Sequence, residues 1–176
     1  MIFRETKLAG AYVVDIERLE DDRGFFARSW CRREFEAHGL NPNLAQCNIS
    51  FSTKKSTMRG MHYQAEPFEE AKLVRCTMGS LYDVIVDLRQ DSPSFRKHVG
   101  IILTPDNRKM LYVPEGFAHG FLTLEDKTEV YYQISAFYAP EYERGFRWND
   151  PAFGIVWPSE VKIISDRDRN YPDFSF

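Results

Sequence analysis

The second half of the chain consists of short apolar or alternating runs that end at turn residues, and this rhythm constrains the fold more than any other feature. Runs of about four to eight such residues, bounded by Gly, Pro, Asn or Asp, predict β-strands. No strand–helix alternation appears, so the series favours antiparallel strands. The runs, each with the turn that follows it, are KLVRCT and MGS, LYDVIVDLR and QDSP, VGIIL and TPDN, KMLYVP and EGFAHG, TEVYYQISAFY and APE.

One short helix and no domain boundary are predicted for the rest of the chain. In CRREFEAHGL, charged residues interleave with Phe35, and Gly39 is placed as a C-terminal stop. No repeat is visible and no Ser/Gly/Pro-rich linker divides the 176 residues, a length that suits one domain. We therefore expect residues 1–176 to form one mostly β domain, a jelly-roll barrel or sandwich with a few short helices.

Composition excludes several classes of partner. The formal net charge is −3 and no Lys/Arg-rich block is present, so the positive surface that nucleic acid requires is missing. No apolar run approaches membrane-spanning length, and MIFRETKLAG at the N-terminus carries Arg4, Glu5 and Lys7 where a signal peptide would have its apolar core. Cys31, Cys47 and Cys76 are odd in number and show no CxxC spacing, which predicts neither disulfides nor a zinc ribbon. We expect a cytoplasmic protein with no nucleic acid or membrane partner.

Polar residues near the N-terminal end of the chain indicate a binding cleft. Arg23 in DDRGFF precedes a glycine, and an isolated Arg-Gly pair is usually only a turn. Gln46, Asn48 and Ser50 alternate along QCNIS and therefore share one face of a predicted strand. A face that packs on a core is normally apolar, so three polar residues on one face predict a solvent-filled cleft.

Further candidates are a lysine, two histidines and two tyrosines. His62 lies in MRGMHYQ, Lys72 begins the strand-like run that follows, and His119 lies in PEGFAHGF. Tyr132 and Tyr138 are six residues apart, an even spacing that puts both rings on the same face of a continuous strand. Histidines and tyrosines at such positions are more often packing residues than catalysts, so no single one of them establishes a function.

The histidine pattern argues against a metal site. The spacing PxGxxH around His119 resembles the second motif of the cupins, small jelly-roll barrels whose metal-binding members add a His-x-His pair and a carboxylate. Here His62 is followed by tyrosine and Gln64, so the second histidine of that pair is missing. The remaining histidines, His38 and His98, lie in the helical stretch and in a charged turn. We expect the cupin shape without a metal or any other cofactor.

Together these motifs closely resemble the dTDP-4-dehydrorhamnose 3,5-epimerase family over essentially the whole chain. Each motif is weak alone, but all occur in one order at family-like spacings. The resemblance implies a metal-free cupin jelly roll, a homodimer that exchanges strands between subunits, and epimerisation of a nucleotide-linked 4-keto-6-deoxyhexose. The matching stretches are DDRGFF, QCNISFS, MRGMHYQ, AKLVRC, YDVIVDLR, SPSF, VPEGFAHGF, YAPEYERGFRWNDPAFGIVWP and SDRD.

The resemblance also implies catalytic roles that suit the chemistry. In a 4-keto sugar the hydrogens on C3 and C5 are both α to the carbonyl, so one base can remove either and leave an enolate on O4. His62 matches the family's base, and Asp168 matches the carboxylate that orients its ring. Lys72 matches the cation beside O4. Tyr132 matches the acid that returns a proton from the other face.

The remaining polar residues match positions that hold the substrate. Arg59 and Arg23 suit the diphosphate, because the planar guanidinium fork fits phosphate oxygens. Tyr138 offers a ring for stacking on the nucleobase, and His119 lies beside the sugar. The predicted substrate-binding set is completed by Arg28, Gln46, Asn48, Glu143 and Arg167.

Three positions depart from the family pattern and leave two questions open. Arg28 stands where the family commonly has Glu, Gln133 where it commonly has Lys, and Arg167 where it commonly has Lys. Because Arg28 lies in a segment that the family uses for nucleotide contact, a CDP- or other NDP-linked sugar remains an alternative to dTDP. Some relatives with the same catalytic residues invert only C3 or only C5, so a single-centre epimerase is also an alternative.

Other reactions and a non-catalytic role also remain open. A nucleotide-sugar ketoisomerase would use the same fold and related enediol chemistry, and a metal-dependent cupin would need ligands that this sequence lacks. A sugar-nucleotide-binding jelly roll would have the pocket without turnover. The combination of His62, Asp168, Lys72 and Tyr132 favours the epimerase, because function is argued from the site and this site is complete by residue type.

Overall fold

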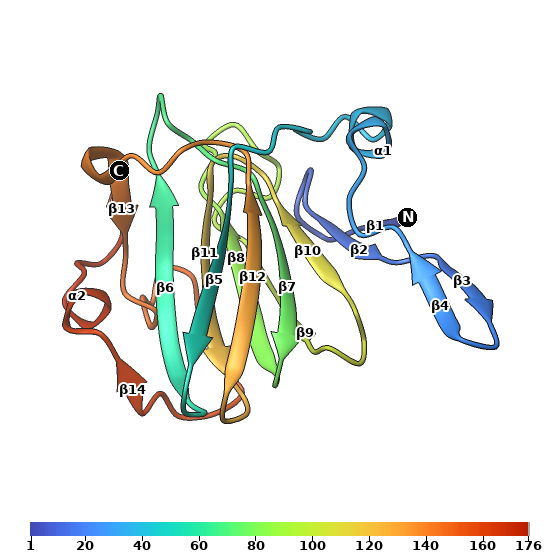
Figure 1. Ribbon diagram of the computed structural model, residues 1–176. Coiled ribbons are helices and arrows are strands. Elements are labelled where there is room, and N and C mark those ends of the chain that lie inside the picture. The colour runs from blue at the N-terminus through green and yellow to red at the C-terminus, as the bar shows by residue number, and fades with distance from the viewer. Residues whose placement is uncertain (176) are drawn as a thin grey trace.

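The computed structural model describes residues 1–175 as two six-stranded β-sheets that lie face to face, with short helices at their edges (Figure 1). This confirms the predicted mostly β, jelly-roll class with a few short helices. In spatial order, the first sheet consists of β1 (Ile2–Glu5), β2 (Tyr12–Asp15), β10 (Met110–Val113), β7 (Lys72–Met78), β12 (Thr128–Ile134) and β5 (Gln46–Ser52). The second consists of β13 (Glu143–Gly145), β6 (Thr57–Gln64), β11 (Phe117–Thr123), β8 (Leu81–Asp87) and β9 (His98–Leu103), with β14 (Ile163–Ile164) parallel to β6.

The main core forms where the inward faces of the two sheets meet. Val74 and Val130 of the first sheet belong to the same buried cluster as Ile85, Phe117 and Phe121 of the second. Burying a side chain of this kind contributes roughly 1.5–3 kcal/mol, so the cluster holds the two sheets together. The alternation that predicted these strands is therefore the alternation between this core and the outer faces.

Strand β11 is buried at all its positions, because the second sheet is covered on both faces. On its outer face, the chain after β13 packs against Met58 and Leu122 through Phe146, Phe153 and Trp157. This covering segment explains why the stretch around His119 reads as an almost continuous apolar run instead of an alternating one.

Three short helical segments accompany the sheets: α1 (Arg32–Ala37), the 3₁₀ turn η1 (Pro140–Tyr142) and α2 (Asp166–Arg169). The predicted stop of α1 is confirmed, because Gly39 adopts a φ of +67° and its N–H donates to the carbonyl of Glu36. The next N–H, of Leu40, donates to the carbonyl of Phe35, and both side chains pack in one cluster. Along residues 1–175 no helix has the length and apolar character needed to cross a membrane.

A hairpin of β3 (Arg18–Asp21) and β4 (Gly24–Ala27) projects from the body of the molecule (Figure 1). Within residues 1–175 these two strands pair only with each other and form a separate two-stranded sheet. Leu19 and Phe26 on the hairpin are 65% and 72% exposed, while Phe25 lies beneath the guanidinium of Arg108, 4.9 Å from its ring centroid. The hairpin therefore presents apolar side chains to solvent in the isolated chain.

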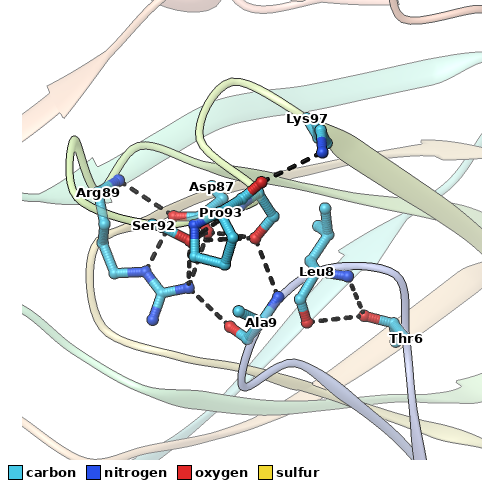
Figure 2. A network of polar contacts seen from close by, with 9 residues as sticks. Thr6, Leu8, Ala9, Asp87, Arg89, Ser92, Pro93 and Lys97 are labelled. Atoms are coloured by element: carbon cyan, nitrogen blue, oxygen red, sulfur yellow. Dashed lines mark hydrogen bonds and ion pairs between the residues drawn. The ribbon is translucent and has the colours of Figure 1, made fainter.

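A polar network ties the turn between β1 and β2 to the loop after β8 (Figure 2). Asp87 is fully buried and accepts hydrogen bonds from Arg89, Ser92 and Ser94. Arg89 also donates to the carbonyl of Ala9 at 2.6 Å, and the Ala9 N–H donates to Ser94 Oγ at 2.9 Å. Burial alone would raise the pKa of Asp87, but the hydrogen bonds from Arg89 and the two serines hold it below its usual value. The network therefore fixes an edge of the first sheet against the second.

Candidate active site

A cleft of about 580 Å³ opens between the sheets, with β5, β7 and β12 on one wall and β6 and β11 on the other. Its volume lies within the range of roughly 300–1,000 Å³ that is usual for small-ligand sites. Gln46, Asn48 and Ser50 all line it, which confirms that this polar face borders a cleft. The predicted site residues that line the cleft are Gln46, Asn48, Arg59, His62, Lys72, His119, Tyr132, Tyr138, Glu143, Arg167 and Asp168.

His62 on β6 and Asp168 on α2 form a hydrogen-bonded pair, with Nε2 of the ring 2.7 Å from Oδ1 of the carboxylate. A carboxylate only accepts, so the ring donates through Nε2–H and leaves Nδ1 free to take a proton. The second carboxylate oxygen accepts the backbone N–H of Gly60 at 3.1 Å, and Ser165 caps α2 by accepting the Asp168 N–H. These contacts give the imidazole a fixed tautomer and orientation.

The surroundings of Asp168 keep it ionised. Burial alone would raise the pKa of this carboxyl, but the hydrogen bond from His62, its positive charge, and the contacts with Gly60 and Ser165 hold the pKa below the usual range. An ionised Asp168 stabilises a protonated imidazole beside it. The pair can therefore take a proton from a ligand and hold the resulting charge.

Two glycines allow β6 and β11 to approach closely beside this pair. Gly60 has a φ of +117°, and a Cβ added there would lie 2.6 Å from Cα of Gly120. A Cβ added at Gly120 would lie 2.6 Å from the sulfur of Met61. The close approach sets the register in which His62 lies opposite His119. It also aims the Gly60 N–H at Asp168.

Lys72 and Tyr132 occupy the opposite wall. The ammonium of Lys72 lies 2.8 Å from Glu70 Oε1, a partner on which the sequence interpretation placed no weight. Burial of Tyr132, together with the nearby charge of Asp83, raises the pKa of its hydroxyl, so this group stays protonated at neutral pH. Because Tyr132 is on the first sheet and His62 on the second, a proton acceptor and a proton donor face each other across the cleft.

A second histidine–carboxylate pair lies at the base of the cleft. His119 Nε2 is 2.7 Å from Oδ1 of Asp83 on β8, and both side chains are buried. The edge of the His119 ring faces Tyr132, with 6.0 Å between ring centroids. Asp83 was not recognised from sequence, because the PxGxxH motif marks His119 but does not indicate the carboxylate, on another strand, that the ring contacts.

The nucleotide-binding candidates form a connected group at the mouth. Tyr138 donates its hydroxyl to Glu143, and its backbone N–H donates to Gln46 Oε1 at 3.1 Å. Arg167 forms an ion pair with Glu143 at 2.7 Å. Although Tyr138 lines the cleft, the predicted reason was wrong, because β12 ends at Ile134 and no continuous strand face extends to it.

Gln64 is a buried side chain that sequence reasoning treated only as the missing metal ligand. Its amide donates to the carbonyls of Phe68 and Phe137, at 2.8 and 3.3 Å, and accepts the N–H of Ala139 at 2.6 Å. The amide thus joins two loops at the mouth of the cleft. Within residues 1–175, no three His, Cys, Asp or Glu side chains come together as metal ligands.

Arg23 and Arg28 are not brought to the cleft of this chain. Arg23 lies at the turn of the projecting hairpin, pairs with Asp21 at 2.6 Å, and has a side chain that is 90% exposed. Arg28 follows β4 and pairs with Glu34 at 2.6 Å, with 59% of its side chain exposed. Contact between these arginines and a ligand therefore stays a prediction.

Sequence comparison places the chain among known epimerases. The family model described as dTDP-4-dehydrorhamnose 3,5-epimerase matches residues 5–175. The dTDP-4-dehydrorhamnose 3,5-epimerase of Shigella flexneri is 42% identical over 171 residues, which cover 97% of this chain and 94% of that protein. The similarity thus runs through both walls of the cleft and α2.

Solved structures give the same relationship. The dTDP-4-dehydrorhamnose 3,5-epimerase of Bacillus anthracis str. Ames, with TDP and PPi bound, has a TM-score of 0.93 at 40% identity and covers 98% of this chain and 99% of that one. ChmJ, a 3′-monoepimerase from Streptomyces bikiniensis in complex with dTDP-quinovose, has a TM-score of 0.86 at 31% identity, covering 96% and 85%. The jelly roll is therefore of the cupin type, and the chain belongs to the dTDP-4-dehydrorhamnose 3,5-epimerase family.

Proposed function

We propose that the chain inverts C3 and C5 of dTDP-4-dehydro-6-deoxy-D-glucose to give dTDP-4-dehydro-L-rhamnose, a step of deoxysugar biosynthesis. The observation that carries this proposal is the cleft, with the His62–Asp168 pair on one side and Lys72 and Tyr132 on the other. The 176 residues act as one catalytic domain. We place the reaction in the cytoplasm, where nucleoside-diphosphate sugars are made.

Proton removal is assigned to His62. The C4 carbonyl acidifies the hydrogens on C3 and C5, and Nδ1 of His62 accepts one of them while the electron pair of the C–H bond forms an enolate with its charge on O4. Asp168 stabilises the imidazolium through the Nε2–H hydrogen bond. The ammonium of Lys72 lies on the facing wall, where it would oppose the negative charge on O4.

Proton return is assigned to Tyr132. Its hydroxyl gives a proton to the face of the enolate opposite His62, so a new C–H bond forms with inverted configuration and the carbonyl is restored. Solvent then reprotonates Tyr132 and accepts the proton from His62. Burial keeps the pKa of the Tyr132 hydroxyl high, which holds the proton in place until the enolate has formed. Every inversion therefore leaves one hydrogen from solvent on the sugar.

The proposed active form is a homodimer in which the hairpin β3–β4 reaches the cleft of a second copy. The hairpin pairs with no other strand of residues 1–175, and its Leu19 and Phe26 are exposed. Exchange would cover these side chains and bring Arg23 and Arg28 to a bound diphosphate. Analytical ultracentrifugation at micromolar concentration tests the dimer. A protein that sediments as a monomer and has the same kcat per chain as at higher concentration would contradict it.

The function is tested by proton NMR of the purified enzyme with dTDP-4-keto-6-deoxyglucose in D₂O. Loss of both the C3 and C5 proton signals, with the product signals of the inverted sugar, is the expected result. A matched sample of His62→Asn should lose these signals at least about a hundredfold more slowly, because general-base catalysis is removed.

Each other outcome identifies a different activity. Loss of one signal alone would make the protein a single-centre epimerase. No deuterium exchange with the dTDP sugar, but exchange with the CDP-linked sugar, would show that the enzyme acts on a CDP-sugar instead. Binding of either nucleotide sugar without any exchange would refute an epimerase and leave a binding protein.

A further inference from the structure

The lysine of the cleft is held by a carboxylate that has no assigned role. Nζ of Lys72 lies 2.8 Å from Oε1 of Glu70, and the two side chains are only 12% and 11% exposed. Both line the cleft. We infer that Glu70 is a positioning residue that fixes the ammonium of Lys72 where the enolate oxygen forms. This inference rests on the proposed epimerase function.

The backbone around Glu70 is well placed to act as a rigid support. The N–H of Ala71 donates to Ser135 Oγ at 2.8 Å, and the N–H of Ser135 donates to the carbonyl of Ala71 at 2.9 Å. These bonds continue the pairing of β7 with β12 beyond Lys72 and Ile134. Glu70 and Lys72 are two residues apart on extended chain, so their side chains point to the same side, while Ala71 is buried in the core.

A positioned ammonium is worth more in catalysis than a mobile one. Lysine carries its charge on a flexible four-carbon stem, and a charge stabilises an enolate best when it is in place before the proton moves. Across residues 1–175, Glu70 is the one carboxylate within ion-pair distance of Lys72. An ammonium has three N–H donors, so the bond to Glu70 leaves two for the sugar.

The carboxylate also has an opposing effect. Its negative charge weakens the attraction between the ammonium and a developing enolate. If positioning dominates, removing the charge of Glu70 lowers kcat; if the opposing charge dominates, removing it raises kcat. The two effects have opposite signs, so a single substitution separates them.

The test compares Glu70→Gln and Glu70→Asp with the control Glu69→Gln. Glu69 is the adjacent residue and loses the same charge, but it lines a separate hollow together with Arg89 and Gly116. For Glu70→Gln we expect kcat to fall roughly 10- to 100-fold, as for a misplaced catalytic group, with KM within about threefold. Glu70→Asp should recover part of the loss, and Glu69→Gln should stay within about twofold of the parent. The dissociation constant of TDP should not change in any variant.

A double substitution shows whether Glu70 acts through Lys72. The residual activity of Lys72→Met is measured as solvent-deuterium exchange into the sugar over days. Adding Glu70→Gln to this variant should change that exchange rate by less than about twofold. Three results would each overturn the inference. They are an unchanged or raised kcat in Glu70→Gln, an equal loss of kcat in Glu69→Gln, and a full further loss when Glu70→Gln is added to Lys72→Met. Failure of the proposed function is distinct, because the parent enzyme itself would then show no exchange.

Discussion

Replacing Asp168 by asparagine removes one charge from the candidate active site while the size of the side chain is kept. The new amide must still supply an acceptor to the Gly60 N–H, because a buried donor without a partner costs about 1–3 kcal/mol. With its oxygen turned to Gly60, the amide presents its NH₂ to Nε2 of His62. The ring then has to carry its own proton on Nδ1, and the nitrogen that should act as base is blocked.

The size of the effect follows from these contacts. Returning His62 to the tautomer with its proton on Nε2 costs about the free energy of one buried hydrogen bond. Losing the negatively charged partner of the imidazolium costs about 1.5–3 kcal/mol more. Together the two raise the barrier by about 3–6 kcal/mol, which lowers kcat by about 10²–10⁴. The equivalent change in serine proteases lowers kcat by about 10⁴ for the same reason.

The assay is the rate of solvent-deuterium incorporation at C3 and C5 under saturating substrate. The control is Asp166→Asn, which removes the same charge from the same helix at an exposed position and should leave kcat within about twofold. An Asp168→Asn enzyme with more than about a tenth of the parent kcat would refute the argument from the tautomer. A second readout is stability: since the folded pKa of Asp168 is depressed, its contribution is present at neutral pH and is lost as pH falls below the usual value of 3.8.

Three other substitutions test the acid, the strand contact and the polar network. In Tyr132→Phe, deuterium exchange at one centre should persist while net inversion falls at least about tenfold, and intact inversion by NMR would exclude this acid. Gly60→Ala forces a Cβ to within 2.6 Å of Gly120 Cα, so urea denaturation should show a loss of about 2–4 kcal/mol in unfolding free energy, and an unchanged midpoint would contradict the close approach. Arg89→Ala leaves the buried Asp87 without its cation and should lower the unfolding free energy by about 2–3 kcal/mol at pH 7. The loss is no larger because the partly exposed arginine is screened by solvent. Because the pKa of Asp87 is held low, the difference in unfolding free energy between the parent and Arg89→Ala should shrink when denaturation is repeated below the usual carboxyl pKa. A difference that grew at low pH would count against the network.

The sheets could be predicted from sequence where one face is buried and the other is not. Between Lys72 and Ile134, β7, β8, β9, β10 and β12 follow the predicted runs, because each run records the choice between core and outer face. The turn predicted at EGFAHG was wrong beyond Gly116, because Phe117 begins β11, a strand that is buried on both faces and does not alternate. The helix α2 could not be predicted this way, since DRDR has no apolar periodicity and the segment is held by the Ser165 cap and by contacts with β6. Asp168 was found only because SDRD matches a family motif.

Two of the residues in or beside the cleft that sequence reasoning missed share one property. Asp83 and Gln64 each depend on a partner far along the chain, His119 for Asp83 and Phe137 for Gln64, although Gln64 also bonds the nearby carbonyl of Phe68. Local patterns carry no information about such contacts. Glu70 differs, because its spacing of two from Lys72 already placed both side chains on one side of the chain. What the sequence lacked was any sign that this side faces the cleft.

The hairpin β3–β4 bears on how enzymes of this kind diversify. In the part of the chain that the structure describes, its two strands pair only with each other, so a change in its length or charge leaves the register of both large sheets intact. If Arg23 and Arg28 contact the nucleotide as proposed, the nucleotide that the enzyme binds changes when this hairpin changes. Such a change is the replacement of Arg28 by a carboxylate, or the acquisition of residues 18–27 as a whole from a relative. The proton-transfer groups lie on other segments and are inherited unchanged. Ligand preference and chemistry can then evolve on separate pieces of one small gene.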